Sequence, residues 1–527
     1  MTEQAWGRWG RVLLILGLVA VVATFRGYGI SWDEPLHLEY GRRALEWYLT
    51  LGQDRGVFEY QNLYLYGAAY DTAATALGEL LPLDPYAGRR LLGGLVGLAG
   101  LLAVFKLGRE LAGPRAGTLA VLLLVLTPLW MGHAFANPKD VPFAVAGAWC
   151  TLYQIRILRS LPRPAWRDLV GLGVALGCAL GIRVGGVILL APLALGGPVW
   201  LAQAARRQGI GTELARAVGM AAARLLPALL LAWAVMVAAW PWAQLDPLGN
   251  PVRALTEFSS FPLDFTFRFA GQELRTTDLP WWYVPAGFGV KLPLLVIAAL
   301  GGALGWALAG LARGNLRPER IGLGAAVLLP PAVVMVTDAV LYDGIRHLLF
   351  LLPVLAVAAA LALDRALGLL PERRAWIGPT VLAGWAAAML VDMARLHPYE
   401  AVWYNALAGG VRGADGRYEL DYWGTALSEA ARILSRDIVR AEGAEAITRP
   451  YRVRVCGPHE SALYYLPPRW RAPPDGQGPV DFYVSFTRSP CPDAPKGPEI
   501  VRVERMGVTL AYVLDLRAKP LPAAGGR

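Results

Sequence analysis

Asp33 and Glu34 form an acidic pair directly after the first apolar segment, in the run Ser31-Trp-Asp-Glu-Pro-Leu-His37. A carboxylate can act as a general base on a hydroxyl group, a role that contributes roughly 10²–10⁴-fold to a reaction rate. The same residues also suit a helix start, because Ser31-x-x-Glu34 fits a capping box and Asp33 is a good N-cap. Ionisable groups at a membrane boundary are functional candidates, so both interpretations stay open. His37, four residues after Asp33, should share its helical face.

A second acid, Asp140, follows in the run Asn137-Pro-Lys-Asp-Val-Pro142, at the start of a later apolar segment. A turn with a helix cap and a snorkelling Lys139 would explain this run without any chemistry. The functional alternative is that Asp140 faces the same cavity as Asp33. His133, four residues before Asn137, is more often an interfacial histidine than a ligand.

Several cations lie in segments where membrane orientation does not require them. Arg89 and Arg90 lie at the outer end of the second apolar segment, and Arg346 and His347 lie at the start of the tenth. Arginine binds phosphate in a bidentate manner, so these cations suit an anionic ligand. Pairing with Asp343 or with a lipid headgroup is the alternative.

Further candidates for substrate binding surround an aromatic run that begins at Leu279. This run contains Trp281, Trp282 and Tyr283, and Arg275 precedes it. Such a composition is typical of an aromatic belt at a membrane surface. Lys291 lies inside an apolar run, so we expect it to face protein or water rather than lipid. Arg183, at a helix junction, could be structural.

The composition places these residues on a membrane protein. Hydrophobic residues make up 55% of the 527 residues and charged residues 17%, whereas a soluble domain carries about 25% charge. About twenty apolar residues cross a bilayer as a helix. We therefore expect a mainly α, polytopic protein with about eleven transmembrane helices, near 10–26, 88–107, 116–132, 139–157, 168–183, 185–203, 223–242, 285–311, 321–341, 347–364 and 375–393.

The net charge of +10 reports orientation rather than nucleic-acid binding, because arginines fall between the apolar runs and not on one continuous face. With the N-terminus in the cytoplasm and the first apolar run as an uncleaved anchor, every cytoplasmic loop is basic: 109–115, 156–167, 206–216, 313–320 and 365–374. Residues 1–394 then form the membrane domain. Its long loops 27–87 and 243–284 and the tail 395–527 are extracytoplasmic.

Both the first long loop and the tail should be ordered. Residues 34–50 alternate apolar and charged positions at helical spacing, which predicts an amphipathic helix at the membrane surface. The tail has short β-like runs at 452–456, 480–486 and 508–514, which predict a small α+β domain. Cys456 and Cys491 can form a disulfide if the tail is extracytoplasmic, worth about 3 to 4 kcal/mol. Cys150 and Cys178 lie in apolar runs, and no Cys or His cluster has zinc spacing.

Taken together, these motifs resemble the GT-C superfamily of lipid-carrier-dependent glycosyltransferases, the group of protein O-mannosyltransferases and aminoarabinose transferases. The acidic pair after the first span, the acid at the outer start of a later span and the Leu-Pro-Trp-Trp-Tyr-Val-Pro run carry the resemblance. It covers nearly the whole membrane part. It extends into 397–405, 409–414 and 418–424, which are similar to a bacterial branch of the superfamily.

The resemblance implies transfer of a sugar from a polyprenyl-phosphate donor to a hydroxyl of a protein, lipid or glycan acceptor, outside the bacterial inner membrane. Asp33 matches the family's first-loop acid, Glu34 completes the pair, and Asp140 matches the second-loop acid. Lys139 departs from the family pattern, and the phosphate-binding cations match no position securely, with Arg90, Arg275 and Arg346 as candidates.

For the mechanism, we expect Asp33 to be the base, with its pKa raised by burial beside Glu34. Arginines would stabilise the leaving phosphate, the anomeric centre would invert, and no metal cofactor would be needed. A membrane transporter is an alternative, although the chain shows no repeated halves. A glycan polymerase or ligase is another, and it would use an oligosaccharide on a diphosphate carrier.

Overall fold

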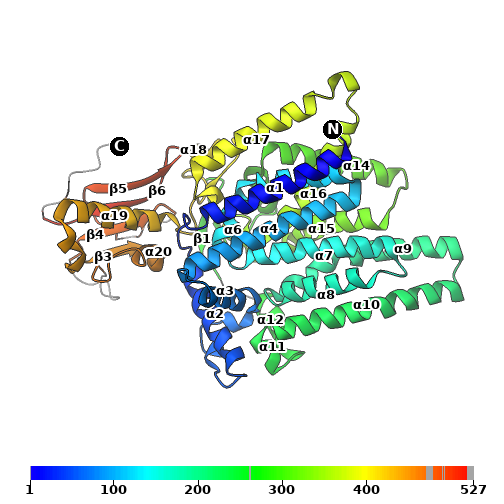
Figure 1. Ribbon diagram of the computed structural model, residues 1–527, viewed down its shortest axis with the longest axis horizontal. Coiled ribbons are helices and arrows are strands. Elements are labelled where there is room, and N and C mark those ends of the chain that lie inside the picture. The colour runs from blue at the N-terminus through cyan, green and yellow to red at the C-terminus, as the bar shows by residue number, and fades with distance from the viewer. Residues whose placement is uncertain are drawn as a thin grey trace.

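The computed structural model describes residues 2–259, 263–470, 479–488, 491, 493–518 and 521. Helices fill one part of the molecule, and a small four-stranded sheet lies at one end of its long axis (Figure 1). Most of the described chain is helical, with a small C-terminal sheet, and the predicted fold class is confirmed.

Among the described residues, nine helical segments are long and apolar enough to cross a membrane, and a bent pair makes up to ten. The helices of the nine segments are α1 (Glu3–Thr24), α4 (Pro85–Ala112), α7 (Asp140–Ser160), α9 (Ala191–Gln208), α10 (Thr212–Ala238), α14 (Leu294–Ala312), α15 (Pro318–Val336), α16 (Leu351–Gly368) and α17 (Ile377–Leu396). The bent pair is α5 (Pro114–Val125) and α6 (Pro128–Ala136), which meet at 66°. The remaining predicted span is α8 (Trp166–Leu180), a helix of 15 residues packed against α7 and α10.

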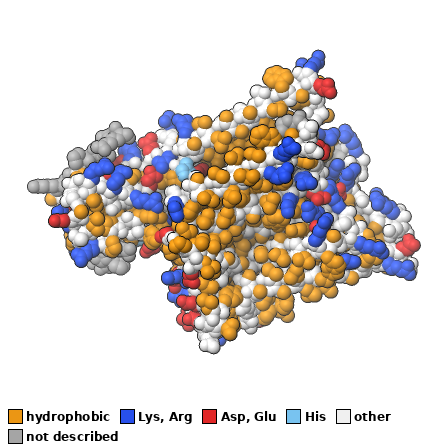
Figure 2. All heavy atoms as spheres, in the orientation of Figure 1, with side chains coloured by type: hydrophobic (Ala, Val, Ile, Leu, Met, Phe, Trp, Pro, Cys, Tyr) orange, Lys and Arg blue, Asp and Glu red, His pale blue; other side chains and the backbone are white. Residues whose placement is uncertain are grey.

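Hydrophobic side chains spread over the helical part of the molecule, and Lys and Arg side chains gather at the end where α1 begins (Figure 2). A bundle that faces lipid has this distribution, because lipid-facing side chains have no reason to be polar. Helix α1 illustrates it, with Ile15, Leu16 and Val19 all more than half exposed.

Small residues on α4 allow α6 to approach it closely. A Cβ atom at Gly93 would lie 2.4 Å from the carbonyl oxygen of Ala134, and one at Gly100 would lie 2.8 Å from the Trp130 ring. Close backbone contact at glycine is a common way for membrane helices to pack. The contact fixes the beginning of α4, with Arg89 and Arg90, beside the end of α6.

The segments between the spans are themselves folded. The predicted amphipathic helix is α2 (Glu34–Leu49), which buries Tyr40, Ala44 and Trp47. The others are α3 (Ala69–Leu80), α11 (Pro241–Leu245), α12 (Gly249–Ser259), the hairpin β1 (Thr266–Phe269) and β2 (Gln272–Arg275), and α13 (Tyr283–Lys291). Short 3-10 turns are η1 (Gly56–Phe58), η2 (Leu63–Leu65), η3 (Val184–Leu190), η4 (Arg346–Leu348), η5 (Glu372–Arg374), η6 (Glu400–Val402), η7 (Ala406–Ala408) and η8 (Ala444–Thr448).

The prediction of one continuous span over 285–311 is wrong. Leu292 has an extended backbone, and the chain breaks there into α13 and α14. The cause is Pro293, because a proline disfavours helical geometry in the residue before it. Lys291 therefore ends a separate short helix, where its Nζ atom donates to the carbonyl oxygens of Ala401 at 3.0 Å and Trp403 at 3.1 Å.

After α17, the chain forms α18 (Gly410–Ala414), α19 (Ala426–Glu442), α20 (His459–Leu463) and a sheet of order β3-β4-β6-β5. Strand β3 (Val453–Cys456) pairs parallel with β4 (Phe482–Phe486), and β6 (Val508–Asp515) pairs antiparallel with β4 and with β5 (Glu499–Arg505). Helix α19 packs on β4, β5 and β6. The three predicted strands are present, as is the Cys456–Cys491 disulfide. Strand β5 was not predicted, because its charged residues obscure the apolar alternation.

Candidate active site

Asp33 lies between α1 and α2 with its carboxylate held by two cations. Its Oδ2 atom is 3.1 Å from Nζ of Lys139 and 3.5 Å from Nη1 of Arg346. The Asp33 side chain is 18% exposed, whereas that of Glu34 is 3% exposed. Of the acidic pair, Asp33 is therefore the carboxylate that a substrate can reach.

The capping interpretation of this run is half correct. Glu34 accepts a hydrogen bond from the backbone N–H of Ser31 at 2.7 Å, as in a capping box. The Ser31 hydroxyl does not complete the box, because it donates to the carbonyl oxygen of Ala136 at 2.7 Å. The Asp33 side chain makes no capping hydrogen bond at all. Glu34 and Ser31 thus hold the start of α2 against the end of α6, and Asp33 is left for the two cations.

Asp140 lies next to the same cations, at the first residue of α7. It is buried and accepts hydrogen bonds from Nδ2 of Asn137 at 2.7 Å and from Arg183. The adjacent Lys139 reaches Asp33, and the charge of Arg346 acts on both acids. The two acids that the sequence singled out therefore lie at one end of the bundle, on either side of Lys139. We call Asp33, Lys139, Asp140, Arg183 and Arg346 the charged cluster.

Residues from the C-terminal part of the chain contact Arg346 and its partner Asp343. Arg346 is buried, its Nε atom is 3.0 Å from Asp343, and its guanidinium lies over the Trp423 ring at 4.9 Å. Asp343 is also 2.6 Å from Nη2 of Arg488, which follows β4 and lies 3.2 Å from Glu419. Arg488 and Glu419 come from parts of the chain far from the cluster in sequence, and sequence analysis did not find them.

Arg90 and His37, two predicted substrate-binding residues, belong to a buried network instead. His37 Nδ1 is 2.7 Å from Asp71, and Arg89 donates to the other oxygen of Asp71 at 2.5 Å. Arg90 lies 3.7 Å from Glu34 and is 2% exposed. These contacts join α2, α3 and α4 to one another, next to the charged cluster. Asp71 was missed, although an acid inside a mostly apolar helix was the available signal.

The aromatic run is divided between the cluster and the surface. The Tyr283 hydroxyl donates to the carbonyl oxygen of Gly344 at 2.7 Å, so Tyr283 shapes the turn that carries Arg346. Trp281 is 76% exposed and Trp282 is half-buried. Arg275 does not join the cluster.

The Arg275 side chain is 62% exposed and pairs with Asp264 at 2.5 Å in the segment before the hairpin. His347 is half-buried next to Arg346 of the charged cluster, with its ring edge-on to Tyr342 at 4.7 Å. His133 is buried rather than interfacial. Its Nε2 atom is 2.7 Å from the Tyr422 hydroxyl.

Known proteins resemble this chain in part of its sequence and in its overall fold. Residues 80–233 match the family model of dolichyl-phosphate-mannose-protein mannosyltransferase. The structure of ArnT from Cupriavidus metallidurans in the apo state superposes with a TM-score of 0.50 at 16% identity, over 96% of this chain and 97% of ArnT. The chain has a GT-C fold.

Two further structures are less similar to this GT-C chain. ArnT bound to undecaprenyl phosphate gives a TM-score of 0.49 at 16% identity, over 96% of this chain and 98% of ArnT. The archaeal oligosaccharyltransferase AglB from Archaeoglobus fulgidus gives 0.46 at 12% identity, over 91% of this chain and 69% of AglB. No curated protein matches the chain in sequence.

The electrostatics of this GT-C site correct one prediction. Burial raises the pKa of Asp33, but the charges of Lys139 and Arg346 outweigh burial, so the pKa of Asp33 lies well below its usual range. The expected rise in the pKa of Asp33 is therefore wrong. Burial instead raises the pKa of Glu34, against the opposing charge of Arg90. The neighbouring acids differ because only Asp33 has two close cations.

Within the described ranges, no group of three or more His, Cys, Asp and Glu side chains could hold a metal ion. The groups that could bind an anion are Lys139 and Arg346. Lys139 stays charged, because the attraction of Asp33 raises its pKa against the effect of burial. An ionised carboxylate beside two fixed cations can accept a proton from a hydroxyl while the cations stabilise a departing phosphate.

Proposed function

We propose that the chain is an inverting glycosyltransferase that moves a sugar from a polyprenyl-phosphate donor to an acceptor hydroxyl at the charged cluster. The observation that carries this proposal is the partly exposed Asp33 carboxylate, held at 3.1 Å by Lys139 and at 3.5 Å by Arg346. The match to a family named for a dolichyl-phosphate-mannose donor supports a lipid-phosphate donor. The acceptor hydroxyl belongs to a protein, a lipid or a glycan.

In the proposed reaction, the acceptor oxygen attacks the anomeric carbon, and the bond from that carbon to the phosphate oxygen breaks. The electron pair of this bond leaves with the polyprenyl phosphate, and the acceptor proton passes to Asp33. An in-line attack inverts the anomeric centre. Lys139 and Arg346 stabilise the charge on the phosphate, which is worth more in a buried site than in water. This mechanism requires no metal.

The low pKa of Asp33 gives the two cations a second role. A donor phosphate would draw Lys139 and Arg346 away from Asp33, because the phosphate and the Asp33 carboxylate compete for the same two positive charges. With the two cations shared with the phosphate, the pKa of Asp33 would rise towards its usual range. The base would then become strongest only when the donor is bound, which disfavours wasteful proton transfer in the empty site.

The remaining predicted site residues act by positioning in this scheme. Asp140, with Arg183, holds the start of α7 and so the reach of Lys139. Glu34 holds the start of α2 through Ser31 and fixes Asp33. His37 and Arg90 hold α2 through Asp71 and Glu34, and His347 packs on Tyr342 beside Arg346. Trp281 and Trp282 would lie at the membrane surface beside the lipid donor.

We further propose that the cluster and the tail from residue 395 face outwards from a bacterial inner membrane, with the N-terminus in the cytoplasm. The positive-inside rule supports this orientation. Lys and Arg side chains gather at the end of the bundle where α1 begins (Figure 2). Asp33 of the charged cluster follows the other end of α1.

The test supplies the purified protein in lipid vesicles with a panel of radiolabelled donors. Sugars on polyprenyl monophosphate should be transferred, and free polyprenyl phosphate should accumulate in step. Transfer from a lipid-diphosphate oligosaccharide alone would support a polymerase or ligase and end the proposal. Loss of transfer with a metal chelator, restored by a divalent metal, would end the metal-independent mechanism.

A further inference from the structure

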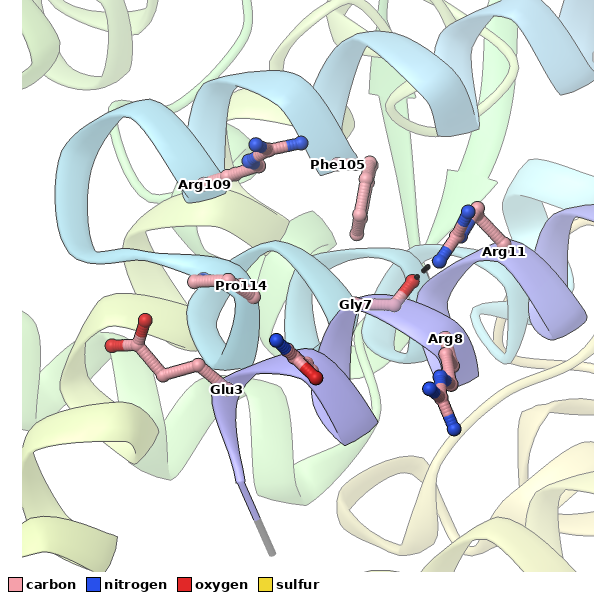
Figure 3. Close-up of a pocket in the computed structure, with 8 residues that line it drawn as sticks. Glu3, Gly7, Arg8, Arg11, Phe105, Arg109 and Pro114 are labelled. Carbon is pink, nitrogen blue, oxygen red and sulfur yellow. Dashed lines mark hydrogen bonds between the residues drawn. The ribbon is translucent and has the colours of Figure 1, made fainter.

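A cavity lies at the opposite end of the bundle from the charged cluster. It has a volume of about 460 Å³ and lies between the start of α1, the end of α4 and the start of α5 (Figure 3). Arg8 and Arg11 line it from α1, and Phe105 and Arg109 line it from α4. Arg109, near the end of α4, is thus about thirty ångströms from Arg89 and Arg90, near its beginning, at 1.5 Å per residue. The proposed sugar transfer makes no use of this cavity.

Basic side chains outnumber acidic ones around the cavity, and Arg11 donates from Nε to the carbonyl oxygen of Gly7 at 3.4 Å (Figure 3). Within the described part of the chain, Arg8, Arg11 and Arg109 form no ion pair, and Glu3 is the single acid among the lining residues. Other arginines at this end do pair, as Arg115 does with Asp364 at 2.5 Å. Guanidinium groups around a cavity without partnering acids favour an anionic ligand, and phosphate matches their planar geometry.

The apolar surface of α1 continues from the same arginines. Arg8 and Arg11 are followed at intervals of three or four residues by Ile15, Val19 and Val22, so all five lie along one helical stripe. Ile15, Val19 and Val22 are between 55% and 60% exposed. The stripe thus carries cations at one end and exposed apolar side chains along the rest, which fits a ligand with a charged head and apolar chains.

From these observations we infer that the cavity binds the phosphate of an anionic phospholipid, with the acyl chains lying along the α1 stripe. The three guanidiniums hold the phosphate, and Phe105 forms an apolar wall beside the glycerol. The lipid belongs to the leaflet at the N-terminal end of α1, opposite the proposed site of sugar transfer. A basic cavity between membrane helices is a recognised kind of site for anionic lipid headgroups.

The experiment titrates the delipidated full-length protein with phosphatidylglycerol or phosphatidylcholine and counts bound lipids by native mass spectrometry. The wild type should retain the first phosphatidylglycerol molecule much more tightly than phosphatidylcholine. The triple variant Arg8→Gln/Arg11→Gln/Arg109→Gln should bind phosphatidylglycerol about tenfold more weakly or worse, given the contribution of each cation near an anionic surface.

A second variant keeps every charge and fills the space. A Cβ atom at Gly7 would meet only Pro114, at 3.9 Å, so the position has room for a β-carbon, and Gly7→Leu would extend a side chain from the wall of the cavity. This variant should weaken the binding of the first phosphatidylglycerol molecule to a similar extent. Because all arginines remain, this variant leaves the charges that orient α1 unchanged.

The matched control is Arg206→Gln/Arg207→Gln/Arg216→Gln, which removes three exposed arginines, two from the last turn of α9 and one from the beginning of α10. Its affinity for the first phosphatidylglycerol molecule should stay within about twofold of that of the wild type. Equal weakening by this control would show a diffuse effect of charge and overturn the site. Unchanged binding in the Gly7→Leu variant would also overturn it. Displacement of the lipid by millimolar inorganic phosphate would assign the cavity to free phosphate rather than to a lipid.

Discussion

Replacing Asp33 with Asn should separate catalysis from donor binding. The substitution keeps the shape of the side chain but removes the group that would accept the acceptor proton. General base catalysis contributes roughly 10²–10⁴-fold, so the transfer rate should fall by that factor, or by about 3 to 5 kcal/mol in the barrier. The fall should appear in kcat, because the lost interaction acts in the transition state.

Donor binding should respond in the opposite direction. The Asp33 carboxylate lies 3.1 Å from Lys139 and 3.5 Å from Arg346. At an effective dielectric constant of about 20, each such contact represents roughly 5 kcal/mol of gross attraction before desolvation. A donor phosphate must compete with this attraction in the wild type and meets none of it in Asp33→Asn. The variant should therefore bind polyprenyl phosphate at least as tightly as the wild type.

The assay measures single-turnover transfer from a radiolabelled polyprenyl-phosphate sugar, together with equilibrium binding of unlabelled polyprenyl phosphate, in the same nanodiscs. Asp264→Asn is the matched control, because Asp264 is also paired with an arginine but is exposed and lies in the segment before the hairpin. A transfer rate within about threefold of the wild type in Asp33→Asn would refute the base. A loss of binding as large as the loss of rate would refute the reasoning about the cations.

Three other perturbations test the surroundings of the cluster. Lys139→Gln should weaken polyprenyl-phosphate binding by about 1.5–3 kcal/mol, as expected for a hydrogen bond to a charged group, whereas Arg275→Gln should leave binding unchanged because that side chain is exposed and paired elsewhere. Burial raises the pKa of Glu419 from 4.5 to about 7, so its contribution to stability is complete below about pH 4.5 and is lost as the pH rises through 7. That loss is at most about 3 kcal/mol, and the melting temperature of Glu419→Gln should depend less on pH in this range. Cys456→Ser removes the disulfide to Cys491, which closes a separation of 35 residues, and should cost about 3 to 4 kcal/mol in the stability of the tail, measured by proteolysis.

Each of these expectations has an opposing result. Equal effects of Lys139→Gln and Arg275→Gln would mean that the donor senses overall charge and not the cluster. If the melting temperature of Glu419→Gln depends on pH as that of the wild type does, Glu419 is not the source of this pH dependence. Unchanged proteolysis of Cys456→Ser, with the wild type unchanged by reductant, would show that the disulfide does not stabilise the tail.

The sequence by itself determined the helical architecture. Hydropathy is a local property, so the apolar runs predicted a helix in all eleven places, including the short α8 and the bent pair α5 and α6. It also identified Asp33, Lys139 and Asp140, because acids and cations beside apolar runs stand out without any knowledge of packing. The break at Pro293 was missed because the apolar composition runs through it unchanged.

Tertiary structure decided which of these residues interact. The sequence could not distinguish a helix cap from a carboxylate held by cations at Asp33, and the structure shows the second, because the Asp33 side chain makes no capping hydrogen bond and contacts Arg346, 313 residues away. The same contact reversed the expected sign of the Asp33 pKa shift. Arg488 reaches Asp343 from the C-terminal part of the chain, and nothing near either residue predicts this pair.

The physical reason is the range of the interactions involved. Helix formation in a membrane depends on the hydropathy and backbone hydrogen bonds of a continuous segment, so it can be read from neighbouring residues. A charged site depends on distances of a few ångströms between side chains from separate helices, and the electrostatic energy changes steeply over such distances. Only the packing of α1, α4, α7 and the turn before α16 sets those distances, and only that packing separates Asp33 from its buried neighbour Glu34.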